Sequence, residues 1–311
     1  MTLVSLILAM LIEQAWPRSG HFSPAERARG FAAMLHRLVG RASAAGQAGW
    51  WLAMSMGMLV VALLHFLLWH LHPALAFGFN VLVLYLTMGY RADLQAFTSI
   101  QVALRIGERL RARTLLADWC GEARPAADER VDVAEVARLA IERALVLAHR
   151  DLFAIAFWFV LLPGPSGALM YRLACLFAER GRDGPIEGTG AAVVPGRRAF
   201  EFIDGLPARL TALSFSVVGN FEDAIYCWRT QAMLWPDRSS GILIASGAGA
   251  LGVRLGMSIH EAGEIRERPE MGTDGEADVD YMQGAVGLVW RALMVCLLFL
   301  AVGSIAGWVG G

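Results

Sequence analysis

Apolar runs as long as a bilayer is thick limit what this chain can fold into. Residues 49–69 and 285–308 each supply the ~20 apolar residues that a spanning helix needs, and tryptophans stand at their ends, as at membrane interfaces. Residues 73–90 form a shorter run that suffices for another span, after a tight turn at 70–72. Only 18% of the 311 residues are charged. We therefore predict an all-α, multipass integral membrane protein with about four to five membrane segments.

A further apolar region, 151–178, is interrupted at its middle by Pro163-Gly164-Pro165. Proline removes a backbone donor and clashes with the preceding turn, so the helix must break there. Each half is then roughly 10–13 residues, which is too short to span a bilayer alone. Broken backbone at membrane depth is tolerated only where protein or a water-filled cavity satisfies the freed groups. A re-entrant or tightly broken helix pair is favoured here over a kinked span.

The polar segments suggest how the chain is organised. Residues 17–48 carry five arginines and one acidic residue, Glu26, so the positive-inside rule makes this basic loop cytoplasmic. Residues 91–150 have the pattern of amphipathic helices on the same side. The predicted parts are N-terminal membrane helices with the basic loop (1–90), a cytoplasmic helical segment (91–150), a broken membrane pair (151–178), a mostly cytoplasmic helical and loop region with the candidate site (179–284), and a C-terminal membrane helix (285–311).

The charged residues exclude several classes of protein. A formal net charge of −1 argues against nucleic-acid binding by bulk charge. All 27 basic residues are arginine, because the sequence contains no lysine. A Walker P-loop and a Schiff base to pyridoxal phosphate both require lysine, so neither is possible. No catalytic residue can be assigned from the pattern.

The most suggestive polar group follows a predicted bend at Gly219-Asn220. Glu222, Tyr226 and Arg229 recur at i, i+4 and i+7 and therefore share a helix face, with Asp223 beside them. Arginine suits bidentate contact with phosphate or carboxylate, and Glu222 or Asp223 could hold Mg²⁺ with a phosphate group. The alternative is an ion-paired helix at the membrane interface.

The segment before this group adds further polar residues. Proline is favoured at the first helical position, so Pro207 is predicted to start a helix, with Asp204 just before it. Arg209 and Arg198 are candidate phosphate or carboxylate ligands, and Asp204 and Glu201 are candidate supporting groups.

Residues 246–252, SGAGALG, match the G-x-G-x-x-G pattern of dinucleotide-binding proteins. The surrounding segments predict helix and provide no β-α-β unit. Small residues for close helix packing explain these glycines better.

The chain resembles the adenosylcobinamide-phosphate synthase family, known as the CobD/CbiB family. The resemblance rests on PGPSGALMYR (163–172), PARLTA (207–212), and AGALGVRLG (248–256) followed by ERPEMG (267–272), in the family's order and rough spacing. The first stretch adds Tyr171 and Arg172 to the candidate binding residues. The start of the chain and the region around Phe157 also resemble AmpE-type membrane sensor proteins.

The family resemblance implies a multipass protein of the bacterial inner membrane that acts in cobalamin biosynthesis. The implied reaction joins an aminopropanol-type amine to a propionate carboxylate of adenosylcobyric acid through an amide bond. The lipid bilayer and a corrinoid substrate are its expected partners, with a homo-oligomer possible. ATP and Mg²⁺ are possible co-reactants, with no covalently bound cofactor and no pyridoxal phosphate.

The sequence departs from the family pattern in two places. The family has Asn-Thr-Leu-Asp after the Tyr-Arg pair, where this chain has Cys175-Leu176-Phe177-Ala178. A His-Pro-Ser-Pro-Asn stretch appears here as WPDRSSG (235–241). Losing hydrogen-bonding groups costs an enzyme much of its substrate recognition. A non-catalytic, AmpE-like sensor or regulatory protein of the cell envelope is therefore the main alternative, and a transporter is a third.

Overall fold

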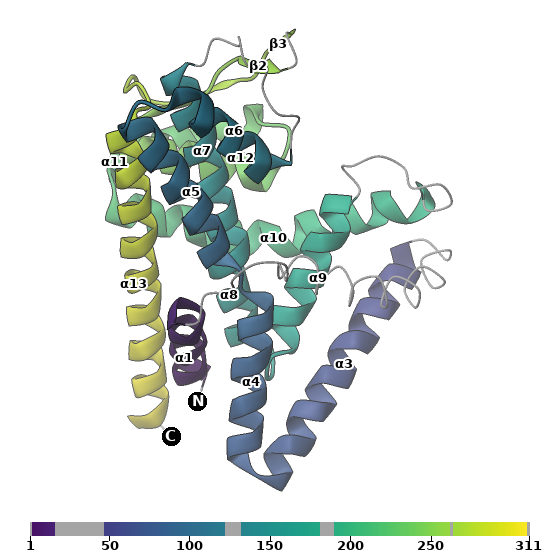
Figure 1. Cartoon of the computed structure of the whole chain (residues 1–311). Coiled ribbons are helices and arrows are strands. Elements are labelled where there is room, and N and C mark those ends of the chain that lie inside the picture. The colour runs from purple at the N-terminus through teal and green to yellow at the C-terminus, as the bar shows by residue number, and fades with distance from the viewer. Residues whose placement is uncertain (1, 16–46, 122–131, 181–189, 262–263, 310–311) are drawn as a thin grey trace. The chain divides into compact units, whose positions relative to one another are not determined.

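The structure is a computed structural model that describes residues 2–15, 47–121, 132–180, 190–261 and 264–309 (Figure 1). The chain divides into two compact units. Unit 1 comprises Met1–Gly89 and Arg150–Leu206, and unit 2 comprises Tyr90–His149 and Pro207–Gly311. Helices dominate both units, which confirms the all-α prediction.

Four helical stretches among the described residues are long and apolar enough to cross a membrane by length and composition. They are Met54–Leu71, Pro73–Arg105, Val133–Leu161 and Val279–Ala306. The prediction of a multipass membrane protein is therefore confirmed. One stretch differs from expectation, because Val133–Leu161 includes residues assigned above to a cytoplasmic segment.

In unit 1, α3 (Gln47–Leu71) and α4 (Pro73–Thr87) form the predicted hairpin, and α1 (Thr2–Ala15) packs on α4 (Figure 1). The turn is tight because His72 caps α4: its ring Nδ1 accepts a hydrogen bond from the Ala74 N–H at 3.2 Å. Proline at the first position of α4 loses no helical hydrogen bond.

The Pro163-Gly164-Pro165 break is confirmed. Helix α8 (Ala154–Leu161) ends before it, α9 (Ser166–Arg180) begins after it, and the two helices pack together. Gly164 adopts φ +64, a left-handed conformation that suits glycine. The Ser166 hydroxyl donates to the Pro163 carbonyl at 2.8 Å and closes the turn.

The first half of the broken pair is longer than the sequence indicated. Helix α7 (Val133–Ala148) continues through the π-helix η1 (His149–Phe153) directly into α8. The expectation of two short halves was therefore wrong for the segment before the prolines. The predicted boundary between residues 150 and 151 lies inside continuous helix, because the π-helix η1 joins α7 to α8.

Helix α10 (Gly190–Val218) runs through Pro207, so the prediction that Pro207 starts the helix was wrong. An interior proline removes one i→i−4 hydrogen bond, and a helix this long persists through that loss. The predicted bend at Gly219-Asn220 is confirmed, because α11 (Phe221–Gln231) begins there. Asn220 is the N-cap of α11, and its side-chain oxygen accepts from the Asp223 N–H at 3.3 Å.

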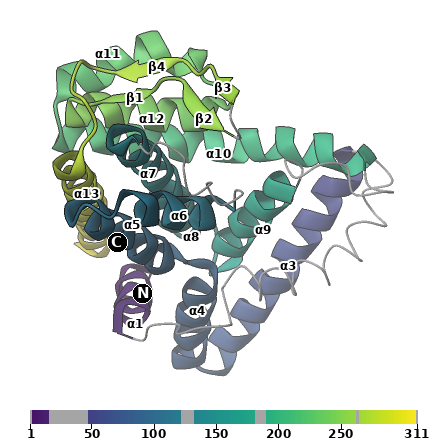
Figure 2. The same cartoon turned by 45° about the horizontal axis from the view of Figure 1, so that its top comes forward.

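In unit 2, α7 lies against several other helices (Figure 2). Its helical neighbours are α5 (Tyr90–Arg105), α6 (Arg109–Cys120), α12 (Arg238–Leu251) and α13 (Val279–Val309). Helix α11 packs on α12, followed by the short 3₁₀-helix η2 (Ala232–Leu234).

Two antiparallel ribbons follow α12. Strand β1 (Arg254–Gly256) pairs with β4 (Glu270–Gly272), and β2 (Ile259–Glu261) pairs with β3 (Glu264–Arg266). Residues 179–284 had been predicted to contain only helices and loops, so the strands are a correction. A Cβ at Gly256 would lie 1.9 Å from the Pro269 carbonyl oxygen, and only glycine permits this close approach of two backbones.

The glycines of residues 246–252 lie in or at the end of α12, as expected for helix packing. A Cβ at Gly249 would lie 2.5 Å from the Asp223 carbonyl oxygen of α11, and one at Gly247 would lie 2.6 Å from Leu145 of α7. Both glycines thus bring helices together, and a helix occupies the place where a dinucleotide fold needs a strand.

Candidate functional site

The predicted site residues are divided between the two units. Unit 1 contains Tyr171, Arg172, Arg198, Glu201 and Asp204, and unit 2 contains Arg209, Glu222, Asp223, Tyr226 and Arg229. Each group is described within its own unit.

Tyr171 and Asp204 form a buried pair in unit 1. The Tyr171 hydroxyl donates to Asp204 Oδ1 at 2.6 Å, and the two side chains have relative exposures of 0% and 1%. The Tyr171 ring also lies 5.8 Å from the Phe200 ring, centroid to centroid. The hydrogen bond and the ring contact fix α9, the helix that follows Pro163-Gly164-Pro165, against α10.

A buried ion pair completes the group. Asp151 of η1 accepts a hydrogen bond from Arg172 of α9, and Arg150 lies 5.7 Å above the ring of Phe200. We call Arg150, Asp151, Tyr171, Arg172 and Asp204 the unit 1 polar cluster. Its formal charges balance, with two arginines and two aspartates.

Arg150 and Asp151 were not predicted from the sequence, although a signal was available. These consecutive ionisable residues directly precede the apolar residues of α8 within one helical stretch. Ionisable side chains inside an apolar spanning segment are costly and usually mark a functional site, and π-helices often occur at such sites. Arg198 and Glu201 are exposed on α10 and do not belong to the buried cluster.

In unit 2, the stretches 248–256 and 267–272 meet in the β1–β4 ribbon. Glu142 of α7 accepts the Gly256 N–H at 2.8 Å and also pairs with Arg268. The Arg268 guanidinium lies 4.6 Å from the ring centroid of Trp235. One buried carboxylate therefore anchors both family stretches to α7.

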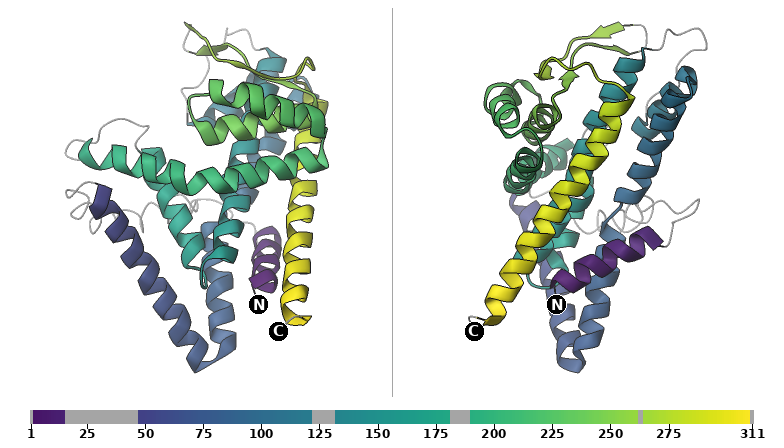
Figure 3. Two further views of the ribbon diagram at one scale, coloured as in Figure 1. Left: turned by 180° about the vertical axis from the view of Figure 1, so that it is seen from behind. Right: turned by 90° about the vertical axis from the view of Figure 1, so that its left-hand side faces the viewer.

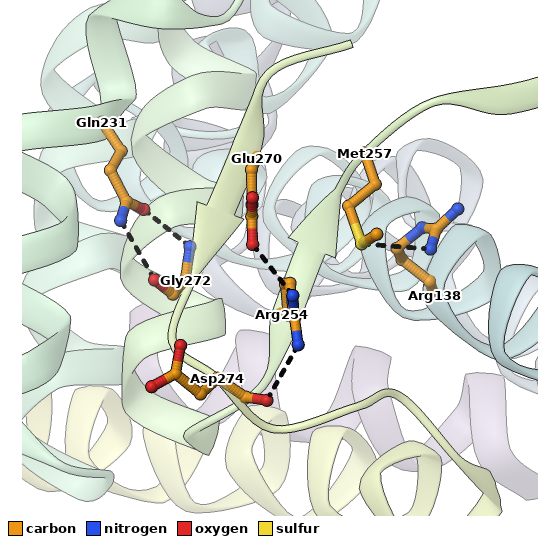
Figure 4. A network of polar contacts seen from close by, with 7 residues as sticks. All are labelled: Arg138, Gln231, Arg254, Met257, Glu270, Gly272 and Asp274. Atoms are coloured by element: carbon orange, nitrogen blue, oxygen red, sulfur yellow. Dashed lines mark hydrogen bonds and ion pairs between the residues drawn. The ribbon is translucent and has the colours of Figure 1, made fainter. Parts of the chain in front are cut away.

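Figure 4 shows a second anchor of the ribbon. The Gln231 side chain accepts the Gly272 N–H at 2.6 Å and donates to the Gly272 carbonyl at 3.0 Å, so α11 holds β4 through two hydrogen bonds. Arg254 and Glu270 pair across the ribbon at 3.3 Å, but this pair is exposed.

Arg138 holds the residues that follow β1 (Figure 4). It is buried on α7, and it donates to the Ser258 carbonyl at 3.1 Å and contacts the Met257 sulfur at 3.5 Å. Met257 has φ +63, which is unusual for a residue with a side chain. The contacts from α7 keep this left-handed residue in place.

The stretch 207–212 also makes a buried polar contact. The Thr211 hydroxyl lies 2.9 Å from His149 Nδ1, and both side chains are buried in unit 2. Neither residue was among the predicted site residues. Every stretch that carries the family resemblance thus contributes a buried polar contact to its unit.

The candidate phosphate group on α11 lies at the surface. Glu222, Tyr226 and Arg229 are exposed, as is Arg209 on α10. Asp223 is half-buried and accepts from the Asn220 side chain at 2.5 Å. Acidic residues in the first turn also stabilise the positive end of α11, so the face has a structural role besides any binding role.

The described part of the chain holds no group of three or more histidine, cysteine, aspartate or glutamate residues that could hold a metal ion. Mg²⁺ that arrives with nucleotide phosphates needs only one or two protein carboxylates. Glu222 and Asp223 could supply these, although Asp223 already binds Asn220.

Apolar spanning helices with buried, paired ionisable side chains define a class: a multipass helical membrane protein with a polar site among its helices. The family model described as CobD/Cbib protein matches residues 188–289. The cobalamin biosynthesis protein CobD of Stutzerimonas stutzeri A1501 is 34% identical over 258 residues, which cover 82% of this chain and 81% of that protein. That of Chromobacterium violaceum is 35% identical over 226 residues, covering 71% and 69%.

The chain therefore belongs to the CobD/CbiB family of cobalamin biosynthesis proteins. No solved structure matches it. The comparisons favour the cobalamin assignment over the AmpE-like alternative.

Proposed function

We propose that the protein catalyses the amide-forming step of cobalamin biosynthesis at the bacterial inner membrane. The reaction joins an aminopropanol-type amine to a propionate carboxylate of adenosylcobyric acid. The observation that carries the proposal is the unit 1 polar cluster. Its five polar side chains lie among apolar helices and lose their hydration, and ionisable residues in such places usually serve a function.

The reaction needs an activating co-reactant, because a carboxylate does not condense with an ammonium group in water. With ATP, a carboxylate oxygen attacks the γ-phosphorus and displaces ADP. That oxygen then leaves with the phosphoryl group as the amine nitrogen takes its place on the carbon. The ammonium loses two protons, one to the phosphate product and one to solvent. ATP and Mg²⁺ are part of this proposal, and pyridoxal phosphate is not.

The unit 1 polar cluster supplies groups suited to holding a carboxylate or phosphate. The Arg172 side chain is 15% exposed while its partner Asp151 is 6% exposed, so the guanidinium is the more accessible member of the pair. A planar guanidinium binds carboxylates and phosphates through two hydrogen bonds. Tyr171 and Asp204 support Arg172 by fixing α9 against α10.

In unit 2, the proposal assigns phosphate binding to the exposed arginines. Arg209 and Arg229 would contact phosphate oxygens, and Tyr226 would lie beside them. Glu222 and Asp223 would be the carboxylates available to a nucleotide-bound Mg²⁺.

The test is an assay with purified, reconstituted protein, adenosylcobyric acid, aminopropanol phosphate, ATP and Mg²⁺. ATP-dependent formation of the amide product supports the proposal. Arg172→Ala should abolish it, while Arg111→Ala, which removes an exposed arginine paired with Glu108, should not. Wild-type protein that binds the corrinoid but never forms the amide would overturn the reaction assignment.

Complementation provides an independent test in cells. The wild-type gene should restore growth of a bacterial strain blocked at cobinamide formation, and the protein should fractionate with the inner membrane. Failure of a stably expressed wild-type protein to restore growth counts against the enzyme.

A further inference from the structure

The half of α10 that belongs to unit 2, residues 207–218, has its polarity reversed. Thr211 and Ser216 are buried, with relative exposures of 3% and 0%. Leu210, Leu213 and Val217 are 43%, 44% and 56% exposed. A helix on the surface of a water-soluble protein has the opposite arrangement, with apolar residues inside and polar residues outside.

The half of α10 in unit 1 shows the same reversal. Asp204 is 1% exposed, whereas Phe202 and Leu206 are 80% and 51% exposed. The outward apolar residues recur at helical spacing and so form one stripe. The α10 stripe consists of Phe202, Leu206, Leu210, Leu213 and Val217.

A contact with α13 gives the depth of this stripe. Within unit 2, α10 crosses α13 (Figure 3). The Ser214 hydroxyl lies 3.4 Å from the Cys296 sulfur at this crossing. Arg291 is the last charged residue of α13, and residues 292–309 carry no charge. At 1.5 Å per residue this uncharged part is about 27 Å long, close to the thickness of the hydrocarbon core. Arg291 therefore marks the membrane interface.

Cys296 lies five residues beyond Arg291, or about 7.5 Å along the helix axis. Interfacial amphipathic helices bury their apolar face about 5–10 Å into the boundary between headgroups and acyl chains. The crossing thus places α10 at the depth where such helices lie.

We propose that α10 is an in-plane interfacial helix, whose stripe contacts the acyl chains of the bilayer while Arg209 reaches the phosphates of anionic lipids. Arg209 is exposed and lies three residues from Leu206 and four from Leu213, at the edge of the stripe. Long basic side chains of this kind extend along apolar surface to the headgroups. The inference shares Arg209 with the proposed phosphate site, but the position of the stripe against the bilayer does not depend on the reaction.

Spin labels on the stripe test the proposal. Cysteine is introduced singly at Leu210, Leu213 and Val217, in a background in which Cys120 and Cys296 are serine, and the protein is reconstituted in phosphatidylcholine–phosphatidylglycerol vesicles. The control label replaces Arg254 on β1, whose side chain is 36% exposed. Collision with oxygen, relative to a water-soluble nickel chelate, should be several-fold higher on the stripe than at Arg254.

Two results would overturn the proposal. Nickel chelate reaching the stripe labels as readily as Arg254 would place α10 in water. Poor collision with both reagents, together with dipolar broadening between labels, would show that a second copy of the chain covers the stripe. Circular dichroism confirms the fold of each variant, and a label at Leu206 replaces any that unfolds the protein.

Discussion

Tyr171 donates a 2.6 Å hydrogen bond to Asp204, and both side chains are buried in unit 1. Tyr171 follows the Pro-Gly turn on α9, whereas Asp204 lies within α10. Burial removes water as an alternative partner, so the hydroxyl and the carboxylate oxygen Oδ1 rely on each other for this hydrogen bond. The pair therefore links the family stretch 163–172 to a second helix.

Replacing Tyr171 by phenylalanine should keep the packing of the ring and remove only this hydrogen bond. A bond to a charged group contributes about 1.5–3 kcal/mol, so the thermal midpoint in detergent should fall. If the positioning of α9 matters to the reaction, amide formation should fall about tenfold or more. Tyr281→Phe is the control, because that hydroxyl makes only a 3.4 Å contact with Gly252. Equal behaviour of the two variants would contradict the role of the pair.

The ion pair between Glu142 and Arg268 should be far more sensitive to mutation than the pair between Arg254 and Glu270. Arg268→Ala leaves the buried Glu142 carboxylate without its main counter-charge, which costs about 3–5 kcal/mol. Arg254→Ala breaks an exposed pair worth at most about 1 kcal/mol.

Limited proteolysis of the β1–β4 ribbon and thermal unfolding in detergent would measure both effects. A ribbon that is equally protected in the two variants would show that Glu142 does not anchor it.

The spans and the helix break were predictable because they follow from local rules. An apolar run as long as α3 or α13 has few alternatives to spanning, and Pro163-Gly164-Pro165 cannot continue a helix. Pro207 shows where local rules fail. Its preference for a helix start was overridden, because the residues on both sides of it continue α10.

Close packing at Gly249 predicts a sharp difference between two glycine-to-alanine changes. A Cβ at Gly249 would lie 2.5 Å from the Asp223 carbonyl oxygen, so α11 and α12 must separate, at a cost of about 1–3 kcal/mol. At Gly287 on α13 an added Cβ meets nothing within 4 Å, and alanine should be neutral or slightly stabilising. Thermal unfolding of both variants in detergent measures the difference. Equal midpoints would show that α11 and α12 are not packed through this glycine.

A glycine-to-alanine change at Gly164 should likewise disturb the turn between α8 and α9. Alanine there must adopt φ +64, and its Cβ would lie 2.6 Å from the His65 ring. Gly164→Ala should therefore lower the thermal midpoint and loosen α3 from the turn, which cross-linking between cysteines placed on α3 and α9 would detect. Gly78→Ala, with open space around it, is the control. Unchanged cross-linking in Gly164→Ala would show that the turn tolerates a side chain.

The buried contacts of the candidate site were harder to predict, because they join residues far apart in sequence. Glu142 and Arg268 are 126 residues apart, and no local sequence pattern predicts that they pair. The acidic and basic residues of α7 predict a polar helix face, but not the ribbon that covers it. Conversely, the regular spacing of Glu222, Tyr226 and Arg229 predicts their common helix face without showing what they bind.

Cys227 on α11 provides a probe of the predicted Mg²⁺ site. Burial, and to a smaller extent the negative charge of Asp223, raise the pKa of the Cys227 thiol above its usual value. A raised pKa means less of the reactive thiolate at a given pH, so alkylation should be slow near neutral pH and accelerate only as the pH rises past the usual thiol range. Asp223→Asn removes the charge and should shift this rise toward lower pH.

Mg²⁺ bound at Asp223 would neutralise the same charge. If Mg²⁺ with ATP binds there, adding both to the wild-type protein should accelerate iodoacetamide labelling of Cys227, as Asp223→Asn does. The same addition should leave labelling of Asp223→Asn unchanged, which separates a local effect from a general one. Mass spectrometry of the labelled peptide at several pH values measures the rate. If Mg²⁺ and ATP leave the labelling rate of Cys227 in the wild-type protein unchanged, Mg²⁺ does not bind at Asp223. Asp223 then has a structural role alone, as the side chain that Asn220 holds at the start of α11.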